Sequence, residues 1–165
     1  MLDQTAKRGT WYGGGSAAAL ACALAAALLE KLASRPGAAE SLRTIRTRCT
    51  KLIEQDAHAF ARVIQTHMHR DRQAVRRALK VAIEVPAEVY TASQRLLTAA
   101  ARIRPTLTPA YTSDLRCAVA LARASGQAAQ VLVKTNLKWL GDRTYTQQIR
   151  RRLQSVQQHA DRILR

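Results

Sequence analysis

The sequence predicts an all-α protein, an antiparallel bundle of five to six helices packed around a buried, alanine-rich central helix. Hydrophobic residues make up 47% of the chain and are mostly Ala, Leu, Val and Ile, with a single Phe. Only seven glycines and four prolines interrupt the 165 residues, which favours close-packed helices over a sheet. The length is typical of one domain, so we expect residues 1–165 to form a single domain that opens with a short polar arm at 1–12.

Capping residues, glycines and prolines divide the chain into helices. The expected spans are about 16–34, 39–69, 71–84, 86–101, 114–140 and 145–164. Ser16 and Ser113 are expected as N-caps, and Pro86 is expected to mark a helix boundary or a kink. The first helix is small and apolar on every face, which places it at the centre of the bundle. Its apolar run of fourteen residues is too short to span a membrane.

A single carboxylate interrupts the apolar stripe of the second helix. Asp56 lies four residues after Leu52 and four before Phe60, at the spacing of one helix face. The remaining stripe residues are Leu42, Ile45, Cys49 and Val63. A buried carboxylate is costly unless it is paired or used in chemistry. We therefore expect Asp56 to point into the bundle.

The cysteines and histidines provide no evidence for a disulfide framework or a metal site. Cys22, Cys49 and Cys117 are odd in number and widely spaced, and the four histidines have no ligand spacing. We expect no metal and a reducing intracellular compartment, either the cytoplasm or the mitochondrial matrix.

The charge is the most unusual feature of the composition. Twenty-seven Lys and Arg stand against eleven Asp and Glu, a net charge of +16. Such a surface attracts polyanions, with a merely solvated basic surface as the alternative. The candidate phosphate-binding residues are Arg70, Arg72, Arg76, Arg77, Lys80, Lys134, Lys138, Arg143, Arg150, Arg151 and Arg152. The last three were expected at the head of the final helix, where the positive dipole end disfavours cations and suggests a compensating anion.

Five short motifs are spread over nearly the whole chain. They are Gly13–Ala21, Asp56-Ala57-His58-Ala59-Phe60, Val85-Pro86-Ala87-Glu88, Ser113-Asp114-Leu115 and Asn136-Leu137. Together they resemble the helical domain of the formiminotransferase-cyclodeaminase and methenyltetrahydrofolate cyclohydrolase family. The resemblance implies a helical bundle, usually a homodimer. It also implies a tetrahydrofolate derivative as substrate, with no cofactor and no metal.

The resemblance also implies roles for individual residues. Asp56 is the candidate acid–base catalyst, because a carboxylate with a raised pKa can move the protons of either folate reaction, and it is expected to point toward residues 13–16. Gly13, Gly14, Gly15 and Ser16 are expected to bind an anionic part of the substrate at a helix start. Ser113, Asp114 and Asn136 are expected to contact the pterin. Each residue also has a structural alternative: helix crossing for the glycines, an ion pair for Asp56, and ordinary helix-end roles for the others.

The chain departs from the family pattern at several polar positions. Tyr12 replaces a proline, Leu107 and Thr108 replace a Gly-Asn pair, and Leu132 replaces an asparagine. Loss of ligand groups with the core pattern retained favours a repurposed, non-catalytic subunit whose basic surface binds RNA or docks in a large assembly such as a ribosome-like particle. The alternative is an active folate cyclohydrolase or cyclodeaminase, whose basic surface attracts polyglutamylated folate.

Overall fold

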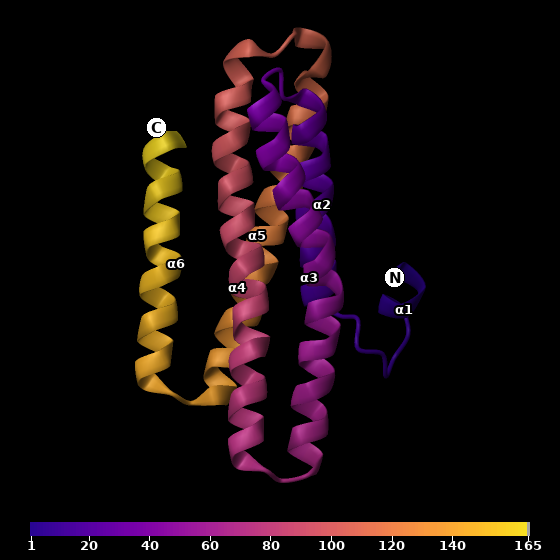
Figure 1. Cartoon of the computed structure of the whole chain (residues 1–165), viewed down its shortest axis with the longest axis vertical. Coiled ribbons are helices and arrows are strands. Elements are labelled where there is room, and N and C mark those ends of the chain that lie inside the picture. Colours follow the sequence, from indigo (N-terminus) through magenta and orange to yellow (C-terminus); the bar gives the residue numbers. More distant parts are fainter. Residues whose placement is uncertain (165) are drawn as a thin grey trace.

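The computed structural model describes residues 1–164, and it confirms the all-α prediction (Figure 1). No strand occurs within that range. The helices are α1 Leu2–Thr5, α2 Gly14–Leu32, α3 Pro36–Met68, α4 Arg72–Ile103, α5 Thr112–Leu140 and α6 Arg143–Leu164. Two short 3-10 turns, Arg104–Thr106 and Pro109–Tyr111, join α4 to α5.

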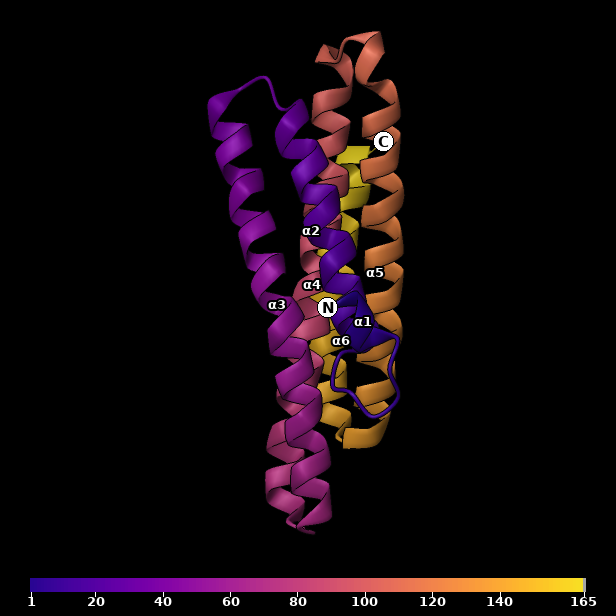
Figure 2. The same ribbon diagram turned by 90° about the vertical axis from the view of Figure 1, so that its right-hand side faces the viewer.

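The long helices run antiparallel, and α2 lies between α3 and α5 (Figures 1 and 2). α4 packs against α5 and α3, whereas α6 packs mainly against α4. At one end the α3–α4 hairpin projects beyond the other helices, so its tip has few neighbours (Figures 1 and 2). This projecting end is called the hairpin tip below.

The central helix α2 is buried on the faces that meet α3, α4 and α5. Ala19, Cys22 and Ala25 have no exposed surface, and the buried Ser125 hydroxyl donates to the Ala18 carbonyl at 2.8 Å. The predicted central helix is confirmed, although one side of it reaches the surface, where Leu24 is 49% exposed. α2 contains 19 residues and is long and apolar enough to cross a membrane by length and composition, so the length argument against a span fails. In this bundle 56% of its apolar window is buried.

Pro86 lies inside one continuous helix, so the alternative of a helix boundary was wrong. α4 passes through Pro86 from Arg72 to Ile103. A proline has no backbone N–H, so the carbonyl four residues earlier loses its helical donor. That carbonyl belongs to Ala82, and it accepts a hydrogen bond from the Asn136 side-chain amide on α5 at 2.7 Å. A side chain from the neighbouring helix thus repairs the interruption.

The helix ends differ in part from the expected caps. α2 begins after Gly13 and α5 after Tyr111, and neither has a side-chain cap, so Ser16 and Ser113 are not N-caps. Ser16 instead lies within the helix and uses its hydroxyl elsewhere. Gly141 ends α5 in the left-handed conformation, with a φ of 65° that glycine adopts without strain.

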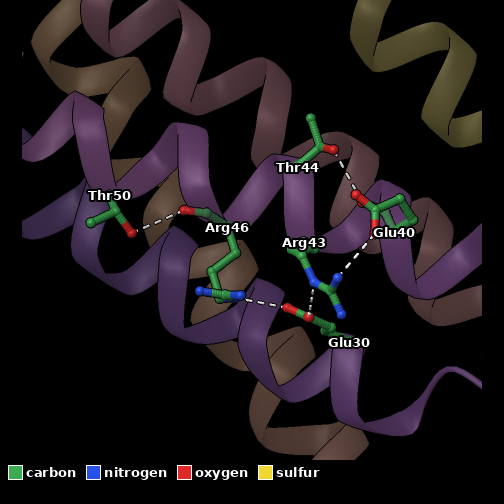
Figure 3. A network of polar contacts seen from close by, with 6 residues as sticks. All are labelled: Glu30, Glu40, Arg43, Thr44, Arg46 and Thr50. Carbon is green, nitrogen blue, oxygen red and sulfur yellow. Dashed lines mark hydrogen bonds and ion pairs between the residues drawn. The ribbon is translucent and has the colours of Figure 1, made fainter.

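Some of the positive charge holds the bundle together. Arg43 and Arg46 on α3 both donate to Glu30 on α2, at 3.0 and 2.7 Å, and Arg43 also reaches Glu40 (Figure 3). The pKa of Glu30 is lowered by these hydrogen bonds, from Arg46 first and then from Arg43. Arg48 likewise forms a two-pronged ion pair with Glu88 on α4. These arginines have internal partners and are structural.

Candidate functional site

Asp56 lies against the start of α2, as the sequence predicted. The Ser16 hydroxyl lies 3.1 Å from Asp56 Oδ2 and also donates to the Ile53 carbonyl at 2.9 Å. A Cβ placed on Gly15 would overlap the Asp56 carboxylate, so only glycine leaves room for this contact. Gly15 therefore has a packing role, as the structural alternative for the glycines proposed. The group from α3 that comes close to its backbone is the Asp56 carboxylate. We call Gly15, Ser16 and Asp56 the glycine junction.

The surroundings of the Asp56 carboxyl raise its pKa. Burial raises its pKa above the ordinary value of 3.8, while hydrogen bonds from the Ser16 hydroxyl and backbone N–H oppose the shift. No lysine or arginine in residues 1–164 forms an ion pair with it. The structural alternative of an Asp56–Arg pair is therefore wrong. A partly buried carboxyl with a hydroxyl neighbour and no countercharge is suited to proton transfer.

The other residues near the start of α2 offer few free polar groups to a ligand. The Leu132 side chain is the nearest group to Gly14, 3.9 Å from where a Cβ would stand, so an apolar side chain faces the helix start. Asn136 already donates to the Ala82 carbonyl. Of the three best-defined cavities in the described part of the chain, none is lined by Asp56.

Ser113 and Asp114 do not join the glycine junction within one chain. Asp114 forms an ion pair with Lys31 Nζ at 2.9 Å, and Lys31 lies in the last turn of α2. Because α2 rises about 1.5 Å per residue, Lys31 and Ser16 lie about 20 Å apart along it. The expected pterin-binding pair is thus at the opposite end of the central helix from Asp56.

Phe60 was expected on the buried stripe, and this was wrong. It is 41% exposed and makes an edge-on contact with Trp11 of the N-terminal arm, with ring centroids 6.3 Å apart. The reason is geometric: α2 begins opposite Asp56, so the later turns of α3 have lost that neighbour and pack on α4.

Several of the candidate phosphate-binding residues have internal partners. Arg152 pairs with Glu84 at 2.7 Å, and Arg76 pairs with Asp142 at 2.9 Å. Lys80 lies 4.9 Å from the centre of the Tyr145 ring. The Tyr145 hydroxyl donates to Glu84, and burial, followed by this bond, raises the pKa of Tyr145 well above its usual range.

The expected position of the arginine triplet was also wrong. α6 begins at Arg143, so Arg150, Arg151 and Arg152 lie in its third turn, where the dipole effect has faded. Arg150 and Arg151 are exposed and have no ion-pair partner among the described residues. Other candidates without such a partner are Arg70, Arg72, Arg77, Lys80, Lys134, Lys138 and Arg143.

Two cavities gather cations that sequence spacing did not group. The larger, about 1410 Å³, lies between α3, α4 and α6; its lining includes Arg35, Arg95 and Arg102 and no carboxylate. The second, about 750 Å³, lies at the hairpin tip beside Trp139. Sequence analysis missed both, because each combines residues from helices whose relative placement only the fold supplies.

Comparison with known proteins decides the family. The family model described as formiminotransferase-cyclodeaminase matches residues 1–155. The chain belongs to that family. Among solved structures, formiminotetrahydrofolate cyclodeaminase from Thermotoga maritima matches with a TM-score of 0.89 and 23% sequence identity, covering 99% of this chain and 89% of that one. At that identity the match supports the shared fold. Comparison with curated proteins gives no match.

Proposed function

We propose that this family member is a non-catalytic subunit whose basic surface binds RNA. The observation that supports it most is the uncompensated charge. Of 27 basic residues, ion pairs engage Lys31, Arg43, Arg46, Arg48, Arg76 and Arg152 in the described part of the chain. Most of the rest stand on the surface, and the lining of the 1410 Å³ cavity between α3, α4 and α6 includes three arginines and no carboxylate. Such a surface attracts a polyanion, because binding releases the counterions that surround the polyanion's phosphates.

The residues at the expected substrate-binding positions support the proposal that the subunit is non-catalytic. Leu132 faces Gly14, Asn136 is committed to the Ala82 carbonyl, and Asp114 is paired with Lys31. The polar groups expected around a pterin are thus replaced, occupied or distant from Asp56. Docking within a large RNA–protein assembly would use the same basic surface.

The test is salt-dependent RNA binding by the purified chain. We expect the logarithm of the affinity to fall linearly with the logarithm of salt concentration. Replacing Arg150 and Arg151 with Gln should reduce that slope by about two, without changing sequence preference. The matched control replaces Arg43 and Arg46, which removes the same charge from residues that already bind Glu30, and it should change the slope much less. Equal effects of the two pairs, or no affinity at low salt, would refute the proposal.

A second function is favoured by one observation, the Asp56 carboxyl in the glycine junction. In this alternative the chain is an active folate enzyme that either cyclises formimino-tetrahydrofolate with loss of ammonia or hydrolyses methenyl-tetrahydrofolate, and Asp56 moves the proton. Ser113 and Asp114 would then have to come from a second copy, because they lie at the far end of α2. The half-exposed Leu24 gives α2 an apolar surface for such a homodimer.

A direct turnover assay separates the two functions. The non-catalytic proposal expects no conversion of either folate substrate. Turnover that is lost in Asp56→Asn, while helical content is unchanged, would establish the enzyme instead. Activity per chain that falls on dilution would indicate that the site needs two copies.

A further inference from the structure

The hairpin tip combines exposed apolar groups with unpaired cations. Its cavity lies between the end of α3, the start of α4 and the end of α5, and it has a volume of about 750 Å³. The lining groups used below are His67, Met68, Arg70, Arg72, Arg76 and Trp139. None of the residues lining this cavity is a carboxylate.

Two large apolar side chains of the cavity lining are exposed to solvent. Trp139 is 59% exposed and Met68 is 77% exposed, although both are large apolar side chains. Trp139 is one of only two tryptophans in the chain, and Trp11 is already in contact with Phe60. Exposed apolar surface rimmed by polar groups is characteristic of a binding site. A flat, exposed indole in a cavity is a surface on which a planar ring can stack.

Three arginines line the same cavity as this indole. Arg76 forms an ion pair with Asp142 at 2.9 Å, which holds its side chain at one side of the cavity. Arg70 and Arg72 are exposed and have no ion-pair partner among the described residues, so their guanidinium groups are available to an external anion. Arg70 also has a φ of 55°, the only positive φ at a non-glycine residue within 1–164. An arginine therefore occupies the turn position at which glycine would be easier to accommodate.

We propose that this cavity binds an unpaired nucleotide of single-stranded RNA, with its base stacked on Trp139 and its flanking phosphates held by Arg70 and Arg72. The assignment rests on the proposed RNA-binding function and names where it occurs. Guanidinium forks match phosphate oxygens, and aromatic side chains stack on any base face, so binding is tolerant of sequence. A ligand with phosphates alone would leave Trp139 and Met68 without a role.

Tryptophan fluorescence tests the stacking directly. In a Trp11→Phe chain, Trp139 is the only tryptophan. At low salt we expect a short oligoadenylate to quench its emission, and inorganic polyphosphate to bind without comparable quenching. Trp139→Ala should weaken oligoadenylate binding about tenfold, the usual effect of removing one stacking platform. It should leave polyphosphate affinity unchanged. Arg70→Gln with Arg72→Gln should weaken both ligands.

The matched control is Val131→Ala, which trims another exposed apolar residue of α5, 63% exposed, that does not line the tip cavity. It should leave oligoadenylate affinity unchanged. RNA binding that is salt-dependent but neither quenches Trp139 nor responds to its removal would overturn this site while leaving the proposed function intact. No RNA binding at all would overturn both. An equal loss of polyphosphate affinity in Trp139→Ala would show that the tip binds charge alone. If that variant unfolds, the quenching result in the Trp11→Phe chain decides.

Discussion

The glycine junction and the hairpin tip differ in whether their polar groups have partners within the chain. At the junction the Ser16 hydroxyl contacts both Asp56 and the Ile53 carbonyl, and Gly15 leaves room for nothing larger than hydrogen. At the tip, Arg70 in the turn and Arg72 at the start of α4 have no ion-pair partner among residues 1–164, and they line the same cavity as the exposed Trp139. The junction is satisfied internally, whereas the tip leaves its charge and apolar surface for an external partner.

This contrast shows what each region contributes. A buried polar group without its partner costs free energy, so the junction tolerates few side chains. An exposed cation costs little, so the tip can vary without unfolding the bundle. Substitutions at the junction should therefore change stability, and substitutions at the tip should change binding.

The largest expected effect is at Gly15. In Gly15→Ala the new methyl group overlaps the Asp56 carboxylate, and we expect a net loss of about 2 kcal/mol of unfolding free energy, after the gain in helix propensity, measured by urea denaturation. Gly14→Ala is the matched control, because its Cβ would meet only Leu132 at an ordinary 3.9 Å and the change should be neutral or stabilising. Adding Asp56→Ala should relieve most of the Gly15→Ala cost. Similar behaviour of the two glycine variants would contradict the tight junction.

A smaller effect is expected where Asn136 repairs the interruption at Pro86. Asn136→Leu keeps the branching of the side chain but leaves the Ala82 carbonyl without its donor, at a cost of about 1 kcal/mol. In a Pro86→Ala background the restored backbone N–H can serve that carbonyl, so the same change should cost much less. A double-mutant cycle by thermal unfolding measures this coupling. Additive effects would mean that Asn136 does not act through the Ala82 carbonyl.

The same two contacts illustrate how far sequence could predict this molecule. Helix spacing placed Asp56 on the apolar face of α3, because periodicity fixes which residues share a face, and the family resemblance directed it toward the glycines. It could not identify the partner of Asn136, since that bond depends on a carbonyl released by Pro86 on another helix. Nor could it locate the tip cavity, because Trp139 and Arg70 meet only through the packing of α5 against the α3–α4 hairpin.

The smallest and most specific test compares two aspartates whose pKa shifts have opposite signs. Burial raises the pKa of Asp56 at the junction above 3.8. At the tip, Asp71 accepts hydrogen bonds from the backbone N–H groups of Ala74 and Gln73, and these, the Ala74 bond first, lower its pKa below 3.8. A raised carboxyl pKa means that the folded state binds the proton more tightly than the unfolded state, so the contribution of Asp56 to stability is lost as the pH rises through its folded pKa. A lowered pKa means the reverse, so the contribution of Asp71 is lost as the pH falls below 3.8.

Replacing each residue with Asn removes the titration while keeping an oxygen acceptor. Relative to Asp56→Asn, the wild-type protein should therefore lose stability as the pH rises from about 4 into the range where the buried carboxyl ionises. Relative to Asp71→Asn, it should lose stability only as the pH falls below about 4, because asparagine also caps a helix well. Denaturant unfolding at a series of pH values would show two difference curves with slopes of opposite sign. Curves of the same sign would mean that the hydrogen bonds from Ser16 outweigh burial and lower the pKa of Asp56, as the backbone N–H groups do for Asp71. The junction would then no longer differ from the tip in the property that distinguishes a buried acid from a helix cap.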